Sequence, residues 1–326
     1  MKEKDANKKK TFTPIKDEVR REFLAKENGA ILPTIFYDTP SEIQINREQL
    51  IIILEEEQKL RTSESVIEKY DKHEIFDYGM LDRDIRINAL KHKLPGILQK
   101  SESEIDWDDA LKAYELSCGE YINDPEIKEI VVWMKYDKTR LGNLKKGDDV
   151  ITDGINLYGI NDLSKHSFKD LLSTTKPNIL VAGSLTWPPF RLFGVDTLNE
   201  IYNNYVVNDK VNLIVVYISE AHARDEWPLS NKFVIKQHKT LEDRRKAVEI
   251  YLSNFNVSYK SCIYLDEINI TNDLKFPCIE KVYSCWPERG YIFSKNMKIE
   301  YIAMAQIEDL VRWAWDIPAW LKENVV

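Results

Sequence analysis

The feature that most constrains the fold of this chain is a pair of apolar segments separated by one helix pattern. The segments, "NILVAGSL" at residues 178–185 and "VNLIVVYI" at residues 211–218, are short and rich in branched aliphatic side chains, as expected of buried strands. Between them, Pro188-Pro189 opens a helix pattern, and proline suits a first helical turn because that turn leaves its amide hydrogens unused. Two strands joined by a helix are predicted to be parallel, with a right-handed crossover.

The elements predicted after this unit complete an α/β fold. They are a helix, a strand, a hairpin and a closing helix, at residues 241–255, 261–266, 290–304 and 306–325. Thr240 and Asp243 have the spacing of a capping box, and the hairpin is expected to turn at Lys295-Asn296. This βαβ–α–ββα order predicts a thioredoxin-like fold with a peroxiredoxin-type core.

The first 140 residues are predicted to be mostly helical. Residues 41–70, 105–122 and 124–136 carry apolar side chains at helical spacing, and Asp124 before Pro125 is a typical helix start. Gly, Asp and Asn then punctuate residues 142–162, which indicates turns and short strands. We therefore expect a helical region at residues 1–140 and a thioredoxin-like domain at residues 141–326. The helical region carries no chemical motif, so a role in packing or in forming a homodimer is expected of it.

Composition limits the partners of this chain. The net charge of -8 argues against nucleic acid as a partner, since such binding needs a basic face. The sequence contains no apolar run of about 18 residues, so no membrane span and a cytoplasmic location are expected. The four cysteines form no CxxC pair and have no zinc-like spacing. No Gly-rich phosphate loop is present, and neither a metal nor a tightly bound cofactor is predicted.

Four segments resemble the iodothyronine deiodinases in order and in spacing. They are "GSLTWPPFR", "VVYISEAHARDEW", "IKQHKTLEDRR" and "WPERGYIFSKNMKIEY", where the family has Gly-Ser-Cys-Thr-Sec-Pro-Pro-Phe, "YIEEAHxxDGW", "QHxxxxDR" and "ERLYVV". The resemblance covers roughly residues 144–322. It implies a reductive dehalogenase whose nucleophile attacks a ring-bound iodine, leaving a selenenyl iodide that an external thiol reductant returns to the selenol. The resemblance implies an iodinated aromatic compound, such as a thyroid hormone, as the substrate, while the residues themselves leave open any halogenated phenol or a substrate without halogen.

The resemblance also implies which residues form the site. Trp187 occupies the nucleophile position, with Thr186 in the same motif; Glu220 and His222 deliver the proton; and Ser184 joins their hydrogen-bond network. Two further residues, His238 and Arg289, are implied to bind substrate. The physical reasons are independent of the family: a helix N-terminus stabilises an anion at its first turn, and a carboxylate that hydrogen-bonds an imidazole holds its tautomer.

Each of these residues also has a purely structural interpretation. Glu220 could be a solvated loop residue, and a histidine after a strand is more often structural than catalytic. Arg244-Arg245 could lie on an exposed helix face, and Arg289 could pair with Glu288. Only a joint occurrence favours a site over these structural interpretations. The matching side chains are those of Ser184, Glu220, His222, His238 and Arg289.

The chain departs from the family pattern at two positions. Leu185 stands where the family has Cys, and Trp187 where it has selenocysteine. An indole has no ionisable nucleophilic atom, so a literal Trp187 removes the first chemical step. Two explanations remain open. In the first, the codon is UGA and specifies selenocysteine in the protein, and only the conceptual translation of the gene writes it as Trp. In the second, the nucleophile was lost and the protein is a binding relative. Retention of the acid–base residues favours the first.

Two further alternatives concern the chemistry. A thiol or selenol peroxidase of peroxiredoxin type would use the same fold, although the "EAH" and "QH" segments favour dehalogenation. Cys285 precedes Trp286-Pro287, in the loop that approaches the nucleophile in thioredoxin folds, so it could resolve a selenenyl intermediate. The competing interpretation of Cys285 is a small buried apolar side chain.

Overall fold

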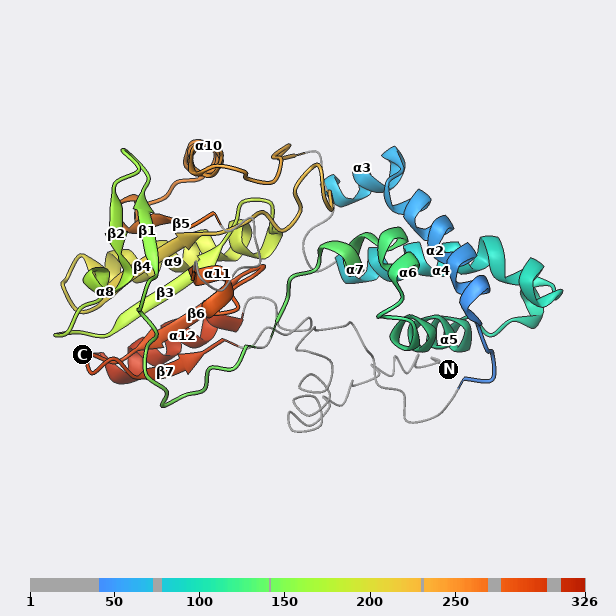
Figure 1. Ribbon diagram of the computed structural model, residues 1–326, viewed down its shortest axis with the longest axis horizontal. Helices are drawn as coiled ribbons and strands as arrows, with labels where there is room; N and C mark the ends of the chain where they lie inside the picture. Colours follow the sequence, from blue (N-terminus) through green and yellow to red (C-terminus); the bar gives the residue numbers. More distant parts are fainter. Residues whose placement is uncertain are drawn as a thin grey trace, which may run out of the picture.

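A computed structural model describes residues 41–72, 78–140, 142–229, 232–268, 277–303 and 312–325. Figure 1 shows a helical unit, which holds the first described helices, beside an α/β unit built on a sheet. The helices of the helical unit are α2 (Arg47–Arg61), α3 (Glu64–Lys72), α4 (Tyr78–Leu98), α5 (Trp107–Glu120), α6 (Pro125–Ile130) and α7 (Val132–Tyr136). The prediction of helices before residue 140 is thus confirmed for the described residues, while a domain boundary at residue 140 stays a prediction.

The local start and stop signals of the helical unit account for its helices. Asp124 caps α6 by accepting hydrogen bonds from the amides of Glu126 and Ile127, as its place before Pro125 predicted. Residues 41–70, whose apolar side chains have helical spacing, form the two helices α2 and α3. The break falls at Thr62 and Ser63, whose hydroxyls donate to carbonyls of the preceding turn and so compete with the helical ladder.

The α/β unit is built on one sheet. Its described strands are β1 (Asn156–Gly159), β2 (Lys165–Ser167), β3 (Asn178–Gly183), β4 (Asn212–Tyr217), β5 (Ile263–Asp266), β6 (Arg289–Phe293) and β7 (Ile299–Ile302), in the order β2-β1-β5-β4-β3-β6-β7. β3 and β4 are parallel, as predicted, and so are β4 and β5. β6 pairs antiparallel with β3, and β7 with β6. This arrangement is a thioredoxin-like fold.

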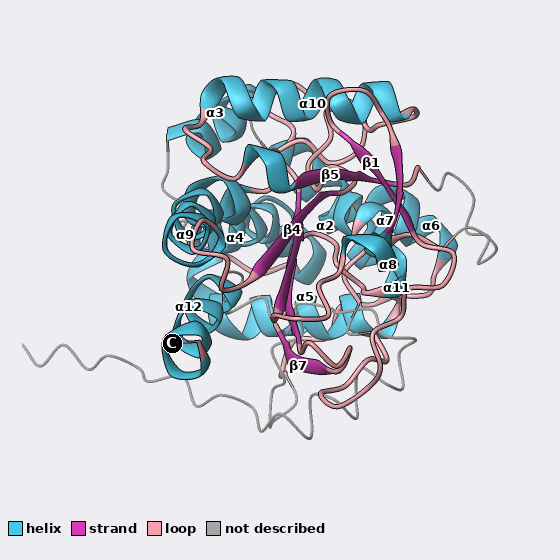
Figure 2. Ribbon diagram, turned by 90° about the vertical axis from the view of Figure 1, so that its left-hand side faces the viewer, coloured by secondary structure: helices cyan, strands magenta, loops and turns pink. Residues whose placement is uncertain are grey.

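Helices cover both faces of this sheet (Figure 2). Residues of α9 (Val195–Ile201), α10 (Leu241–Asn254) and α12 (Arg312–Asn324) share one apolar cluster with Ile179 and Val181 of β3. The alternate residues Leu180 and Ala182 face a second cluster with α8 (Phe168–Leu171) and α11 (Ile279–Val282). Because successive side chains of a strand point to opposite faces, β3 is buried on both sides.

The connection from β3 to its helix fixes where the site begins. A Cβ added at Gly183 would lie 2.3 Å from the ring of Phe190, so the glycine lets the start of the helix pack directly on the strand. Residues 188–206 continue as one helical segment through wider turns at Phe190–Gly194 and Tyr202–Val206. Position 187 therefore lies just before a helix that is anchored on the central strand.

Three smaller predictions have different outcomes. Thr240 caps α10 with a reciprocal capping box to Asp243, as expected. The spacing of Ser167 and Asp170 in the sequence also predicts a capping box, but Ser167, at the start of α8, makes no side-chain capping bond, so this prediction is wrong. The reason is that Ser167 is also the last residue of β2, and α8 has a single turn. The hairpin between β6 and β7 turns at Lys295-Asn296, as predicted.

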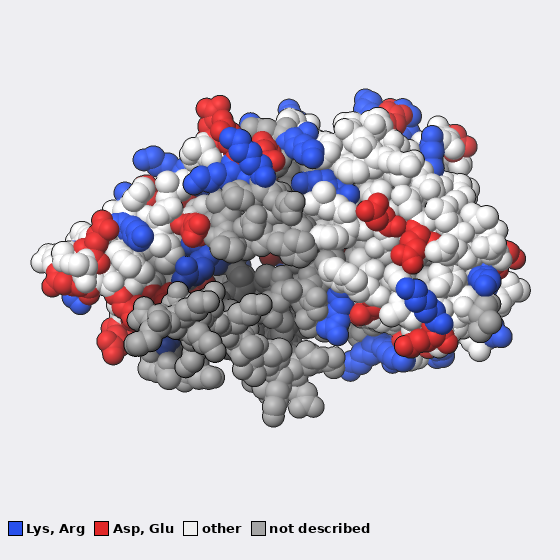
Figure 3. Space-filling view, turned by 180° about the vertical axis from the view of Figure 1, so that it is seen from behind, with Lys and Arg blue, Asp and Glu red and all other residues white. Residues whose placement is uncertain are grey.

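The surface is of mixed charge, with Lys and Arg interspersed with Asp and Glu on the face seen in Figure 3. Among the helices that the structure describes, none combines the length and apolarity needed to cross a bilayer.

Candidate active site

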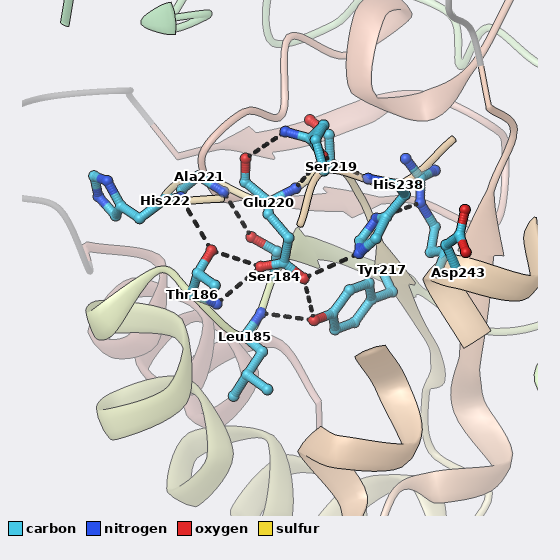
Figure 4. Close-up of polar contacts among 12 residues, drawn as sticks. Ser184, Leu185, Thr186, Tyr217, Ser219, Glu220, Ala221, His222, His238 and Asp243 are labelled. Atoms are coloured by element: carbon cyan, nitrogen blue, oxygen red, sulfur yellow. Dashed lines mark hydrogen bonds and ion pairs between the residues drawn. The ribbon is translucent and has the colours of Figure 1, made fainter. Parts of the chain in front are cut away.

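The candidate site lies where β3 and β4 end. These parallel strands pair up to Gly183 opposite Tyr217, so the residues that follow them meet at one edge of the sheet. Ser184 and Thr186 leave β3 there, and Glu220 and His222 leave β4. Figure 4 shows Ser184, Thr186 and His238 gathered around the side chain of Glu220. The structure thus brings together the side chains that the sequence placed in one network.

Glu220 is the centre of this network. It is 0% exposed. Its Oε2 accepts hydrogen bonds from the amide and hydroxyl of Thr186, at 2.9 and 2.5 Å, and its Oε1 accepts from the hydroxyl of Tyr217 at 2.6 Å. Burial alone would raise the pKa of Glu220, but the donors His238, Thr186 and Tyr217 outweigh it and lower the pKa. Glu220 is therefore an ionised buried carboxylate, and its interpretation as a solvated loop residue is wrong.

The imidazole beside Glu220 belongs to His238. Its Nε2 lies 3.3 Å from Oε1 of Glu220, and its Nδ1 accepts a hydrogen bond from Nε of Arg244 at 3.3 Å. Because a guanidinium only donates, Nδ1 carries no proton and the Nε2 proton faces the carboxylate. The expected pairing of Glu220 with His222 is wrong: in Figure 4 the ring of His222 points away from the carboxylate.

Arg244 was missed by the sequence analysis as a site residue. It is 4% exposed and also donates to the carbonyl of Asp266 at 2.7 Å, so the interpretation of Arg244 as part of an exposed face is wrong. Its neighbour Arg245 does lie partly exposed and pairs with Glu242 and Glu249. The signal available in the sequence was the match of Arg244 to the arginine of the "QHxxxxDR" pattern.

Ser184 and Thr186 connect the two loops of the site through main-chain groups. The hydroxyl of Thr186 accepts from the amide of His222 at 3.0 Å while it donates to Glu220. The hydroxyl of Ser184 accepts from the amide of Ala221 at 3.3 Å. Both residues therefore hold the loop after β4 against the loop after β3, which sets the position of His222.

His222 presents an unprotonated nitrogen to the site. Its Nδ1 lies 3.0 Å from the carbonyl oxygen of Trp227, and a carbonyl only accepts, so Nδ1 carries the proton. Its buried Nε2 has no hydrogen-bond partner among the described residues. Burial lowers the pKa of His222 to about 3, with a smaller contribution from the charge of Arg191. At neutral pH the ring is thus an uncharged proton acceptor at Nε2.

Position 187 lies against this imidazole. The indole of Trp187 stacks on His222, with ring centroids 5.5 Å apart and the planes inclined by 27°. Beneath it, Nη1 of Arg191 donates to the carbonyls of Leu185 and Thr186, at 3.0 and 2.9 Å. A smaller side chain at position 187 would have a helix start, a buried guanidinium and an imidazole around it, and the first two favour an anion.

A second buried carboxyl group, that of Glu288, lies near the indole groups of Trp187 and Trp313. Glu288 is 6% exposed, and neither of its oxygens makes a hydrogen bond of normal geometry within the described part of the chain. Burial raises the pKa of Glu288 to about 8, opposed in part by the indole groups of Trp313 and Trp187. The group is therefore mostly protonated near neutral pH. The sequence offered it only as a partner for Arg289, although it directly follows Trp286-Pro287.

Arg289 and Cys285 are in surroundings that do not favour their expected roles. Arg289 is 2% exposed and donates to the main-chain carbonyls of Ala303, Ser284 and Arg140; its role in substrate binding stays a prediction. Cys285 is 0% exposed, and burial raises its thiol pKa well above the usual value, which disfavours a resolving role. The Trp286-Pro287 bond between them is cis.

The side chains at the candidate site form an arrangement suited to proton transfer. In the described ranges, no group of three or more His, Cys, Asp or Glu is placed to bind a metal ion. What the arrangement offers is an ionised carboxylate at Glu220, an accepting imidazole at His222 and a protonated carboxyl group at Glu288. His222 and Glu288 lie beside residue 187, where a thioredoxin-type nucleophile would stand, and Glu220 binds the residue before it, Thr186.

Comparison with known proteins identifies the family of this chain. A family model described as iodothyronine deiodinase matches residues 130–305, more than half of the chain. Type I iodothyronine deiodinase of Xenopus laevis is 36% identical over 137 residues, covering 42% of this chain and 48% of that protein. Thyroxine 5-deiodinase of Rattus norvegicus is 34% identical over 82 residues, 25% of this chain and 26% of that protein. The chain thus spans about half or less of the length of these relatives.

Among solved structures, similar chains include the thioredoxin domain of a thiol-disulfide oxidoreductase from Bacteroides vulgatus, at 16% identity and a TM-score of 0.31 over 54% of this chain and 99% of that one. Another is an uncharacterized thioredoxin-like protein from Porphyromonas gingivalis, at 12% identity and a TM-score of 0.33 over 55% and 96%. The assignment rests on the family model and on the site at the ends of β3 and β4. The chain belongs to the iodothyronine deiodinase family.

Proposed function

We propose that this protein is an oxidoreductase that replaces ring-bound iodine by hydrogen, with a selenol, or a thiol in its place, at position 187. The observation that carries the proposal is the free Nε2 of His222, which faces a side-chain position at a helix start. A buried proton acceptor without a hydrogen-bond partner is destabilising, so such an atom in a folded protein indicates a function. A selenol or thiol at position 187 would be the missing proton donor. The Trp of the sequence then represents a UGA codon that specifies selenocysteine.

The proposed reaction begins with the nucleophile. Nε2 of His222 accepts the selenol proton, and the helix start and Arg191 stabilise the selenolate. The selenolate attacks the iodine: the Se–I bond forms, the C–I bond breaks, and the ring carbon takes the proton from the imidazolium of His222. Two molecules of an external thiol then reduce the selenenyl iodide to the selenol, releasing iodide, one proton and a disulfide. No tightly bound cofactor takes part.

The other residues of the site act on this reaction through position and charge. Glu220 fixes the amide and hydroxyl of Thr186, the residue before the nucleophile, and Thr186 in turn holds the amide of His222. A displacement of this backbone by about 1 Å is enough to reduce the rate strongly. Glu220 is in this proposal a positioning residue, and His222 is the residue that touches the reacting atoms.

One observation favours a second candidate, a binding relative without catalytic activity. The Trp187 indole stacks on His222 and packs partly buried against the apolar clusters on both faces of the sheet. A literal Trp187 is thus accommodated by its surroundings. In that case the indole fills the place of the nucleophile, and no redox step occurs at this position.

The experiment begins with the intact mass of the natural protein, which distinguishes selenocysteine from Trp at position 187. The second measurement is iodide release from iodotyrosine and iodothyronine compounds, with dithiothreitol as reductant, by the selenocysteine protein or by Trp187→Cys. Activity is expected in both, and His222→Ala in the same background should reduce it by about a hundredfold or more. Peroxide reduction without iodide release would favour the peroxidase alternative, and failure of both reactions would overturn the proposal.

A further inference from the structure

The loop that follows β4 crosses from the sheet to the helical unit and contacts it beside α3 (Figure 1). Leu229 packs against the cluster formed by Val66 and Tyr70 of α3 and Ile85 of α4. Trp227 packs against the main apolar cluster of the helical unit and also against a cluster of the sheet. The loop of the site is therefore held by side chains that enter both apolar clusters of the helical unit.

The same loop residue, Trp227, fixes the imidazole of His222. Its carbonyl accepts the Nδ1 proton of His222 at 3.0 Å, and the two rings meet edge to face with centroids 4.9 Å apart. The indole side chain of Trp227 thus lies on the helical unit while its main chain sets the tautomer of the ring. A shift of this residue would move the imidazole and free its Nδ1.

A chain of polar side chains makes a second connection, from the end of the helical unit to Glu220. Lys138, two residues after α7, lies 3.9 Å from the carboxylate of Glu226. Glu226 accepts from the side-chain amide of Gln237 at 2.8 Å, and that amide group binds both the N–H and the carbonyl of Glu220, each at 3.0 Å. The pair of Lys138 and Glu226 is partly exposed and contributes little stability itself, but it orients Gln237.

We propose that the helical unit is a positioning element of the active site, which docks on the loop at residues 221–229 and thereby fixes the tautomer and the direction of His222. The inference rests on the function proposed above for its catalytic consequence. Its structural part does not, because the docking contacts and the ring orientation are properties of the resting protein. The role expected for this unit from the sequence was packing or dimer formation; a role inside the site goes beyond it.

The test compares two substitutions on neighbouring residues of α3 in the full chain. Val66→Ala removes methyl groups from the apolar cluster against which Leu229 packs, while Ile67→Val trims a side chain that is also buried but lies outside that cluster. The first measurement is amide hydrogen exchange in the loop. The reporters are His222, Arg224 and Glu226, whose amides donate to the Thr186 hydroxyl and to the carbonyls of Ile235 and Ala223.

We expect Val66→Ala and Leu229→Ser to raise exchange at these amides about tenfold or more, and Ile67→Val to leave it unchanged. The ¹⁵N shifts of His222 should at the same time change from a single Nδ1–H tautomer to a mixture. Unchanged exchange and an unchanged tautomer in both Val66→Ala and Leu229→Ser would overturn the inference. Equal exchange in Ile67→Val and Val66→Ala would also overturn it, because the loop would then respond only to general loosening of the helices.

A kinetic measurement separates this inference from the proposed function. In the Trp187→Cys background, Val66→Ala should lower kcat about tenfold with a smaller change in KM, because the ring that transfers the proton is misplaced while the rest of the site is kept. A change confined to KM would contradict positioning of His222. Absence of any activity in Trp187→Cys itself overturns the proposed function, whereas the exchange and tautomer results still decide the docking role.

Discussion

Two buried glutamates flank position 187, and their surroundings give them opposite charge states. Glu220, after β4, meets donors from Thr186 and Tyr217, and its pKa is lowered. Glu288, which directly precedes β6, makes no hydrogen bond of normal geometry with the described residues, and burial raises its pKa to about 8. Burial is nearly the same at 0% and 6% exposure. The comparison shows that hydrogen-bond donors, and not depth, decide which carboxyl group is ionised.

The largest effect is expected when the charge of Glu220 is removed. Glu220→Gln keeps the shape but turns an amide N–H toward groups that donate to it, so buried donors lose their acceptor. We expect the free energy of unfolding at pH 7 to fall by about 3–5 kcal/mol, measured by urea denaturation. Glu249→Gln, at an exposed pair on α10, is the control and should change it by less than about 0.5 kcal/mol. Equal stability of Glu220→Gln and the parent would contradict the network.

Glu288 should show the opposite pH dependence. Its pKa is raised from 4.5 to about 8, so it contributes stability that is complete below about pH 4.5 and is lost as the pH rises through 8. From pH 5 to pH 7 this amounts to about 2.5 kcal/mol. Glu288→Gln stays neutral, so its free energy of unfolding should lack this decline relative to the parent. Urea titrations across this range provide the measurement, and parallel profiles for parent and variant would show that Glu288 is ionised in the folded protein.

Tyr217 tests this explanation, because it is one of the hydrogen-bond donors that Glu220 has and Glu288 lacks. Tyr217→Phe removes the 2.6 Å bond to Glu220 and leaves the amide of Leu185 without its acceptor. We expect a loss of about 1–2 kcal/mol in the free energy of unfolding and a rise in the pKa of Glu220. Tyr259→Phe, which breaks a buried tyrosine pair with Tyr251, is the control and should leave the pKa of Glu220 unchanged. A rise in both variants would deny Tyr217 a specific role.

The smallest expected effect concerns the pKa of His222. Its pKa is lowered from 6.5 to about 3 by burial, so its neutral form contributes stability above pH 6.5 that is lost as the pH falls toward 3. Trp187→Cys removes the stacked indole and admits water, which should raise the pKa of His222 by about one unit. An NMR titration of the ring measures this. Trp315→Cys, at an exposed indole of α12, should leave it unchanged; a low pKa persisting in Trp187→Cys would show that other groups bury the ring.

The parts of the site that could be predicted are those set by local pattern. Two apolar runs and a Pro-Pro helix start fixed the parallel pair, and the ends of parallel strands brought Ser184, Thr186, Glu220 and His222 to one edge. The family pattern added His238. The network among them was predicted only in outline, because a pattern does not tell which of two histidines contacts the carboxylate.

The residues that the sequence did not reveal depend on packing between distant segments. Helical spacing cannot tell which of two adjacent arginines turns inward, and only the fold brings Arg244 to His238 and to the end of β5. The burial of Glu288 depends on Trp187 and Trp313, which no local pattern connects to it. The break between α2 and α3 depends on two hydroxyl side chains inside an apolar periodicity that otherwise continues.

The position of β3 in the sheet has a consequence for protein synthesis. β3 lies between β4 and β6, and both neighbours are translated after codon 187. A chain released at that codon would carry an apolar strand with two open edges, which is an aggregation-prone template. If the codon is UGA, termination at this codon therefore affects the folding of the sheet as well as the chemistry of residue 187. Insertion of selenocysteine allows β4 and β6 to be synthesised and to pair with β3. Termination instead releases a fragment in which β3 is unpaired, and we expect proteases to degrade it.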